Sequence, residues 1–273
     1  QYVVLMDDAL ALELGADIHG AVPDVFINAD GFKKSISAPG PGNYLTMAKA
    51  VASAMQIVGE QSVRQHSFVH AHGSSTPANR VTESALLDRI AGTFDIHDWP
   101  VTATKAYVGH SLASASGDQL ISALGSFKYN LIPGIKTIDA IAADVHQQHL
   151  RIGTADVSTA EKPLEVCFIN SKGFGGNNAS AVILGPSVAE RMLRKRYGEE
   201  RFTAYCLKRE QTRTAADAYD QRVLHGQFDI LYNFGNDQID EQQLKMTTEQ
   251  IQVPGFSRPV VFSRDPRYSD MLD

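Results

Sequence analysis

Cysteine is almost missing from this sequence, and so are the long apolar runs of membrane proteins. Cys167 and Cys206 are the only two cysteines among 273 residues, so a disulfide-built scaffold is excluded and a reducing compartment is indicated. No run approaches the roughly 18 uninterrupted apolar residues of a membrane span. The chain opens Gln-Tyr-Val-Val, without a basic signal-peptide start or an initiator methionine. We therefore expect a cytoplasmic protein with no membrane partner, and we expect this chain to be a piece of a longer one.

Basic charge is also in short supply. Lysine and arginine number 25 against 31 aspartates and glutamates, which gives a net charge of −6. Proteins that bind nucleic-acid phosphates or anionic lipids need clustered positive charge, so neither partner is expected. The hydrophobic share of 43% and the charged share of 21% are typical of globular proteins. The length predicts one or two domains at about 150 residues each.

Helical and strand-like patterns alternate along most of the chain. Apolar side chains at three- and four-residue spacing predict a helix over residues 3–14 that Gly15 ends. Asn43 is expected to cap a helix that runs through Val58, and Gly109-His110 to open another. Strands are predicted over residues 21–29, 68–71, 101–104, 164–169 and 179–184, and a further helix over 77–92. This alternation predicts an α/β fold in which helices cover a mostly parallel or mixed sheet.

The texture of the sequence changes after about Pro186. A charged stretch, predicted to be helical, is followed by segments rich in glutamine and aspartate and by a β-like piece over residues 228–232. No motif occurs in this part of the chain. We therefore place a domain boundary near Pro186, with residues 1–186 as one domain and 187–273 as an extension of unknown role.

Three segments place reactive side chains at the ends of predicted strands, where open α/β folds carry their sites. In the first, His72 leaves a strand into a turn with Ser74 and Thr76. A ring nitrogen there can face a pocket, and the hydroxyls can bind a polar ligand. The alternative is that these side chains only satisfy the donors of the turn and of the next helix.

The second segment joins Lys105 to His110, which is expected at a helix N-terminus. The helix dipole disfavours an imidazolium there, so the ring stays neutral and its N–H can stabilise developing negative charge. Lys105 is near enough in sequence to bias such a site. The alternative is a capping histidine beside a solvated lysine.

The third segment places one aromatic side chain, Phe174, among the glycines of residues 173–176 between two strands. Such a loop can act as a gate, and its backbone N–H groups can contribute to an oxyanion hole. The alternative is a glycine-rich hairpin whose phenylalanine fills a core.

In this order the three segments resemble the C-terminal half of the β-ketoacyl-acyl-carrier-protein synthases, the condensing enzymes of the thiolase superfamily. The segment that begins at His72 is similar to the family's H-G-T-x-T-P motif, residues 105–110 to K-x-x-x-G-H, and residues 173–178 to G-F-G-G-x-N. The resemblance extends to about Pro186 and implies a thiolase-like layered α/β fold with a C-terminal extension. Ser74, Arg80 and Lys172 depart from the residues usual in the family.

The resemblance also implies roles for individual residues. His72 and His110 would hold the malonyl thioester carbonyl and stabilise the enolate, and Lys105 would organise that pair. Phe174 would separate acyl entry from malonyl entry, and its N–H would assist the oxyanion hole. The remaining implied positions are Ser74 and Thr76 on the phosphopantetheine arm, Gly175 and Asn178 in the substrate-binding loop, and Glu83 in a structural role.

The implied reaction is a decarboxylating Claisen condensation of an acyl thioester with malonyl-acyl carrier protein, in fatty-acid or polyketide elongation. The implied partners are acyl carrier protein, the N-terminal half of the synthase and a second copy in a homodimer. No metal and no tightly bound cofactor are expected, because the substrates travel on the phosphopantetheine of the carrier. The family's nucleophilic cysteine belongs to the N-terminal half. Cys167 lies in an apolar run and is expected to be an inert core thiol.

Two other functional readings remain open. The chain is alternatively a non-catalytic synthase-like subunit that shapes the pocket of an active homologue, or a purely structural module. Both histidines and the lysine are present, and a non-catalytic subunit has no need of all three. The motif set therefore favours the enzyme.

Overall fold

A six-stranded mixed sheet forms the centre of the computed structural model, which describes residues 2–32, 38–230, 234–236 and 238–262. The strand order is β1-β8-β7-β2-β3-β5. These strands span Ala21–Ala29 (β1), Ser67–His70 (β2), Trp99–Thr102 (β3), Leu150–Arg151 (β5), Val166–Gly173 (β7) and Asn177–Leu184 (β8). β2 is parallel to β3 and β7, whereas β8 is antiparallel to β1 and β7. The predicted α/β fold with a mixed sheet is confirmed.

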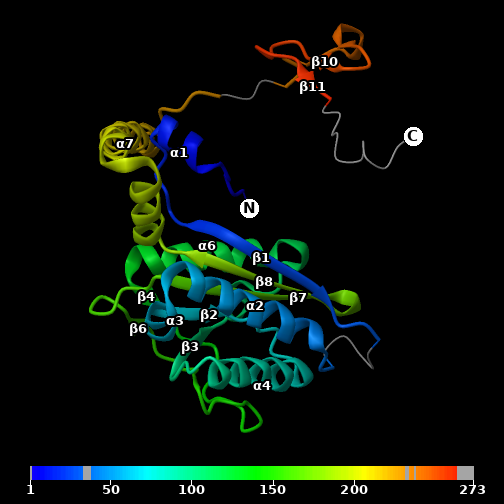
Figure 1. Ribbon diagram of the computed structural model, residues 1–273, viewed down its shortest axis with the longest axis vertical. Coiled ribbons are helices and arrows are strands. Elements are labelled where there is room, and N and C mark those ends of the chain that lie inside the picture. Colours follow the sequence, from blue (N-terminus) through cyan, green and yellow to red (C-terminus); the bar gives the residue numbers. More distant parts are fainter. Residues whose placement is uncertain (1, 33–37, 231–233, 237, 263–273) are drawn as a thin grey trace. The chain divides into compact units, whose positions relative to one another are not determined.

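Two apolar cores lie on opposite faces of this sheet, because successive side chains of a strand point to opposite sides. Val69 and Phe168 belong to a core shared with α2 (Pro41–Val58) and α4 (Pro77–Thr93). Phe68 and Cys167 belong to the other core, which includes Phe127 of α6 (Ala115–Tyr129). Figure 1 shows these helices layered against the strands. The remaining short elements of this part are α3 (Glu60–His66), β4 (Leu131–Ile132) and β6 (Val157–Ser158).

The first two predicted helices begin at other residues than expected. α1 spans Asp8–Leu14 and starts where the Asp7 carboxylate accepts a hydrogen bond from the Leu10 N–H; Gly15, at φ 64°, ends it as predicted. The prediction that Asn43 caps α2 is wrong, because the helix already begins at Pro41, whose fixed φ suits a first helical position. Asn43 lies inside the helix, buried, and donates a hydrogen bond of 2.6 Å to Asn170.

The prediction that Gly109-His110 opens a long helix is also wrong. A single helical turn, α5 (Lys105–Val108), ends at Gly109 with φ 70°, and a 3₁₀ turn (Leu112–Ser114) follows before α6 begins at Ala115. His110 therefore lies in the connection between short helical pieces. A helix dipole therefore does not explain why the His110 ring is neutral.

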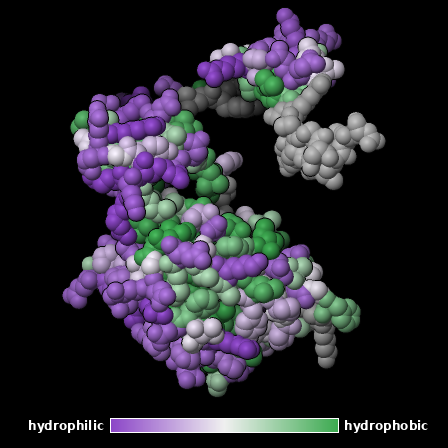
Figure 2. All heavy atoms as spheres, in the orientation of Figure 1, coloured by the Kyte–Doolittle hydropathy of each residue, from purple (hydrophilic) through white to green (hydrophobic). Residues whose placement is uncertain are grey.

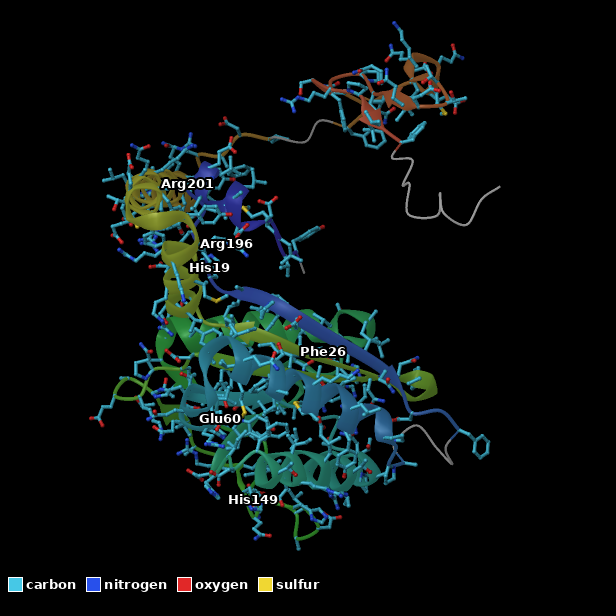
Figure 3. All side chains as sticks on the ribbon, in the orientation of Figure 1. His19, Phe26, Glu60, His149, Arg196 and Arg201 are labelled. Atoms are coloured by element: carbon cyan, nitrogen blue, oxygen red, sulfur yellow. The ribbon has the colours of Figure 1, made fainter. Side chains whose placement is uncertain are left out.

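α7 (Pro186–Leu224) confirms the predicted charged helix, and Gly198 interrupts it with φ 80°. Leu12 of α1 packs with Leu193, Phe202 and Tyr205 of α7 in a small third core. The rest of this helix is mostly hydrophilic (Figure 2). Arg196 and Arg201 are two of its charged side chains (Figure 3), and the Arg201 guanidinium lies 4.5 Å from the Tyr197 ring centre.

The chain divides into two compact units, Gln1–Ala216 and Asp217–Asp273. The second unit contains a 3₁₀ turn (Glu241–Gln243) and a three-stranded antiparallel sheet of β9 (Lys245–Met246), β10 (Gln250–Gln252) and β11 (Val260–Val261). The predicted β-like piece over 228–232 is irregular at 228–230, and its remainder lies outside the described residues. The domain boundary near Pro186 stays a prediction.

Among the described residues, no helix is both long enough and apolar enough to cross a bilayer.

Candidate active site

His72 lies two residues beyond the end of β2, at the edge of the sheet where the carboxyl ends of parallel strands meet. Its side chain is only 8% exposed, and its Nδ1 accepts a hydrogen bond of 3.2 Å from the Lys172 backbone N–H. The turn after it requires glycine, because Gly73 has φ 56° and a Cβ there would lie 2.6 Å from the Cβ of Ala103. The close packing of two strand ends thus fixes where the His72 ring stands.

A buried carboxylate on α4, Glu83, anchors this turn. It accepts hydrogen bonds from the backbone N–H groups of His72 (2.7 Å) and Gly73 (2.9 Å). The side-chain amides of Asn79 (3.0 Å) and Asn170 (2.7 Å) donate to it as well. Burial by itself raises the pKa of Glu83, but the Lys172 charge and the Gly73 hydrogen bond outweigh it and hold that pKa below its usual range. Glu83 is therefore a charged brace beneath the turn.

His110 brings its ring to the edge of the His72 ring. The two ring centres are 5.3 Å apart and the planes meet at 80°. The Leu112 backbone N–H donates to the Nδ1 of His110 at 3.0 Å, as the Lys172 N–H does to His72. A neutral imidazole that accepts at Nδ1 carries its hydrogen on Nε2. Both rings therefore carry an Nε2–H donor, and the two ring centres lie 5.3 Å apart.

Both histidines are neutral near pH 7. Burial lowers the pKa of His72 to about 4, and the Lys105 and His110 charges add to this against the opposing charge of Glu83. Burial and the Lys105 charge also lower the pKa of His110. The neutrality expected from a helix dipole thus has another origin, namely burial and a neighbouring cation.

Lys105 is the first residue of α5 and supplies that cation. Burial lowers its pKa, although the charges of Glu83 and Asp118 act against this. Its Nζ is buried and has no hydrogen-bond partner within the part of the chain that the structure describes. The alternative of a solvated lysine is wrong, because the ammonium nitrogen is buried.

The glycine loop forms the tight end of the β7–β8 hairpin. Phe174 is 79% exposed, so the alternative that it fills a core is wrong. Gly175 follows it at φ 78°. The buried Asn178 amide donates to the Gly176 carbonyl at 2.9 Å and the Asn177 amide to the Phe174 carbonyl at 2.9 Å. The structure thus places Asn178 beneath the loop as a brace, with Phe174 projecting above it.

Ser74 and Thr76 occupy the connection between β2 and α4. Ser74 lines a cavity of about 740 Å³ together with Lys105 and His110. Thr76 is exposed at the position before α4, and its hydroxyl makes no capping hydrogen bond. The alternative in which this hydroxyl caps the helix is wrong. Apolar residues of the 135–152 segment form the opposite wall of the cavity, among them Ile135, Ile138, Ile141 and Ile152.

Arg80 ties α4 to the cavity's opposite wall. Its guanidinium donates to both oxygens of Asp144, at 2.8 and 2.9 Å. The two parallel hydrogen bonds make this one of the geometrically specific ion pairs at the surface. Arg80, which departs from the residue usual in the family, therefore has its ion-pair partner, Asp144, within this chain.

Two residues that the sequence motifs did not indicate complete the site. Gln119 donates from its amide to the carbonyls of His70 (3.1 Å), Ala71 (2.8 Å) and Asn170 (3.0 Å). Asn170 joins Glu83 to Asn43 of α2. Gln119 follows Asp118 and Asn170 precedes Ser171, so neither is marked in the sequence by its neighbours.

The cysteines lie apart from this constellation. Cys167 is fully buried in the α6-side core, and burial raises the pKa of its thiol, as expected of an inert core residue. Cys206 is a half-buried free cysteine on α7.

Comparison with known proteins points in one direction. Residues 19–139 match the family described as beta-ketoacyl synthase, C-terminal domain. The chain is 72% identical over all its 273 residues to the beta-ketoacyl-[acyl-carrier-protein] synthase FabY of Pseudomonas aeruginosa, of which it covers 43%. It is 30% identical over 182 residues to 3-oxoacyl-[acyl-carrier-protein] synthase 2 of Vibrio cholerae, covering 66% of this chain and 42% of that one. The chain thus spans less than half the length of these curated relatives.

Solved structures give the same picture. The crystal structure of the ketosynthase FabY from P. aeruginosa superposes with a TM-score of 0.90 at 71% identity, covering 98% of this chain and 42% of that chain. A ketosynthase domain of Streptomyces albus, OzmH KS7, matches with a TM-score of 0.56 at 18% identity, over 66% of this chain and 32% of its own. The second likeness shows the fold alone.

Proposed function

The chain carries the C-terminal domain of the β-ketoacyl synthase family, and from that premise we propose that it supplies the histidine half of a condensing-enzyme active site. The observation that carries the proposal is the pair of neutral imidazoles, with ring centres 5.3 Å apart, each of which accepts a backbone hydrogen bond at Nδ1 and so keeps its hydrogen on Nε2. The proposed reaction joins an acyl thioester to malonyl-acyl carrier protein, with loss of carbon dioxide, in fatty-acid chain elongation.

The histidine pair stabilises the charge that decarboxylation creates. When the bond between the malonyl α-carbon and its carboxylate breaks, carbon dioxide leaves and the electron pair forms an enolate on the thioester. The Nε2–H groups of His72 and His110 donate to the enolate oxygen. Donors fixed before the reaction stabilise such an oxyanion without reorganisation. The enolate carbon then attacks the acyl thioester and displaces its thiolate, which forms the new carbon–carbon bond.

Lys105 and Glu83 keep the pair ready for this step. The positive charge of Lys105 lowers the pKa of both His72 and His110, which keeps the rings neutral donors. Glu83 holds the backbone on which His72 stands. Neither residue needs to transfer a proton for the enolate to form.

The substrate approaches over the exposed side of the site. We assign Ser74 and Thr76 to the phosphopantetheine arm, since Ser74 lines the cavity and Thr76 is exposed two residues further along the same connection. Phe174 acts as the gate, on an exposed loop next to Gly175. Asn178 contributes by bracing that loop.

The proposed partners follow from the same reaction. Acyl carrier protein delivers both substrates, and no tightly bound cofactor takes part. The nucleophilic cysteine comes from an N-terminal half, because Cys167 is buried with a raised pKa. A homodimer and a cytoplasmic location stay predictions.

The test uses the complete enzyme, N-terminal half included, with malonyl-acyl carrier protein as substrate. His72→Ala or His110→Ala should each slow decarboxylation by about 10²–10³, the usual cost of one oxyanion donor. Acylation of the nucleophile should remain measurable in both variants. His97→Ala, at an exposed histidine, is the matched control. Condensation at the wild-type rate in either variant contradicts the proposal.

A further inference from the structure

Lys172 is a charged residue at the site that the proposed reaction does not use. It lies near the end of β7, two residues before Phe174, and its side chain is half-buried. It is one of the three residues that depart from those usual in the family. Arg80, another of the three, has its partner in Asp144. The lysine is the departure whose role in the site has still to be explained.

Both the backbone and the side chain of Lys172 contact the base of the site. Its backbone N–H donates to the Nδ1 of His72 at 3.2 Å, and its ammonium donates to the Oδ1 of Asn79 at 3.3 Å. Asn79 lies in the first turn of α4 and is only 3% exposed. One residue of β7 is thus hydrogen-bonded to the turn after β2 and to the helix that follows this turn.

Glu83 closes a ring of hydrogen bonds with these residues. The Asn79 amide donates to its Oε2 at 3.0 Å, and the His72 backbone N–H donates to its Oε1 at 2.7 Å. The ring therefore runs through four residues in turn, Lys172, His72, Glu83 and Asn79. Loss of the ammonium would open the ring at one place and leave the backbone N–H of residue 172 on His72.

The ring fixes the orientation of the Asn79 amide. The oxygen of an asparagine side chain accepts hydrogen bonds, whereas its NH₂ group donates them. Lys172 offers only donors and the ionised Glu83 only acceptors, so each half of the amide has its complement. Hydrogen bonds in such a chain polarise one another. Asn79 thus connects the cation to the buried carboxylate.

A buried carboxylate requires this kind of support. Glu83 is only 4% exposed, and burial by itself raises its pKa and favours the protonated form. Among the effects that act in the other direction, the Lys172 charge is the largest. The other charged or titratable groups that the described residues bring to Glu83 are His72 in the turn and Lys105 on α5.

We propose that Lys172 is a positioning residue for His72: through Asn79 its ammonium keeps Glu83 charged, and Glu83 holds the backbone on which His72 stands. This inference rests on the proposed function, because His72 is one of the two donors to the enolate. It adds to that function a residue whose side chain lies outside the three motifs. Lys172 acts through Asn79 and Glu83 and does not contact the malonyl group.

Two substitutions at this position separate the charge from packing. Lys172→Met keeps an unbranched side chain and the backbone N–H but removes the ammonium, whereas Lys172→Arg keeps a positive charge with donors. In the complete enzyme, the kcat of malonyl decarboxylation should fall about tenfold or more in Lys172→Met, because His72 loses its fixed position. The KM for malonyl-acyl carrier protein should not change. Lys172→Arg should return kcat toward the wild-type value, and Lys162→Met, at an exposed lysine, is the matched control.

The pH dependence is a readout that a packing role would not move. Loss of a neighbouring cation raises the pKa of a carboxyl group, by about 1–3 units for a close pair. The acid limb of the decarboxylation rate should therefore move to higher pH in Lys172→Met and stay in place in Lys172→Arg. The pKa of His72 rises with the same loss, since the Lys172 charge also lowers it. The ¹³Cδ signal of labelled Glu83, assigned by its loss in Glu83→Gln, reports the carboxyl group alone and should titrate at higher pH in Lys172→Met.

Three results would overturn the proposal. One is a raised KM with unchanged kcat and pH profile in Lys172→Met, which would make the lysine a substrate contact. The second is an unchanged Glu83 titration in that variant, and the third is an equal shift in Lys172→Met and Lys172→Arg. If the wild type does not decarboxylate malonyl-acyl carrier protein, the proposed function fails, while the Glu83 titration still decides whether Lys172 keeps this carboxylate charged.

Discussion

The turn after β2 and the hairpin after β7 both carry glycines and a candidate functional side chain, but they are built in opposite ways. The turn holds His72 at 8% exposure, and four hydrogen bonds to the buried Glu83 fix its base. The hairpin leaves Phe174 79% exposed. The side-chain amides of Asn177 and Asn178 donate hydrogen bonds to backbone carbonyls of its loop. A hydrogen-bond donor to a transition state must be fixed in advance, whereas a gate must move. The burial of His72 and the exposure of Phe174 therefore fit the two roles that we propose for them.

Removing the brace of the turn should have the largest effect. Glu83→Ala leaves four donors without their acceptor, so we expect a loss of about 3–5 kcal/mol in the free energy of unfolding, as for other broken buried charge networks. Thermal and urea unfolding of the complete protein measure it. Glu161→Ala, at an exposed glutamate, is the control and should stay within about 0.5 kcal/mol. Equal stability of the two variants would show that the turn does not depend on its carboxylate.

Acid should weaken the turn after β2, which holds His72, whereas residues 173–178 of the hairpin contain no histidine. His70 and His72 are neutral in the fold, with pKa values of about 3 and about 4, whereas an unfolded histidine titrates near pH 6.5. The unfolded state therefore binds protons that the fold does not, and this stability is complete above about pH 6.5 and is lost as the pH falls toward 4.

The size of this acid effect can be checked residue by residue. The fully buried His70 contributes about 1.4 kcal/mol per pH unit across the window. Urea unfolding at several pH values should show that slope reduced in His70→Gln and retained in Phe174→Ala. A stability independent of pH between 6.5 and 4 contradicts the buried neutral histidine.

A matched pair of glycine substitutions compares the two loops directly. A Cβ at Gly73 would lie 2.6 Å from the Cβ of Ala103, in addition to the strain of φ 56°, so Gly73→Ala should cost about 2–3 kcal/mol. Gly175 has φ 78° but no atom closer than 3.7 Å to such a Cβ, so Gly175→Ala should cost about 1 kcal/mol. Unfolding of both variants under one condition gives the difference. A larger loss at Gly175 reverses the comparison.

The smallest expected effect on stability is at the gate. Phe174→Ala removes an exposed ring, so the free energy of unfolding should change by no more than about 0.5 kcal/mol. Thermal unfolding measures this change. Condensation should nevertheless slow and lose its order of acyl and malonyl entry, measured with the complete enzyme. A loss of about 3–5 kcal/mol with intact kinetics would identify Phe174 as a packing residue.

The regular elements and the reactive positions follow from local sequence. β1 runs from Ala21 to Ala29 as its apolar pattern predicts, and α4 begins at the predicted Pro77. The errors have local causes as well. Pro41 starts α2 ahead of Asn43, and the left-handed Gly109 separates His110 from the helix it was expected to open. Several residues within a few positions of one another can each begin or end a helix, and the pattern of residue types does not decide which of them does.

The braces of the site depend on contacts that no local pattern encodes. Asn43 of α2 and Asn170 of β7 are 127 positions apart in sequence, and they are hydrogen-bonded to each other. Asn170 also donates to Glu83, so the contacts link α2, β7 and α4. Gln119 reaches three carbonyls on two strands, and only the assembled sheet brings these together.

Residue order alone determined the mixed α/β fold, the turn at His72, the position of one aromatic residue on a glycine loop and the burial of Cys167, because each depends on spacing or composition within a few residues. Tertiary structure decided which ring nitrogen of His72 and His110 is left without a backbone partner, since the backbone N–H groups of Lys172 and Leu112 donate to the other. It also decided the protonation of these rings. A pKa depends on burial and on charges brought together from distant parts of the chain, and those exist only after folding.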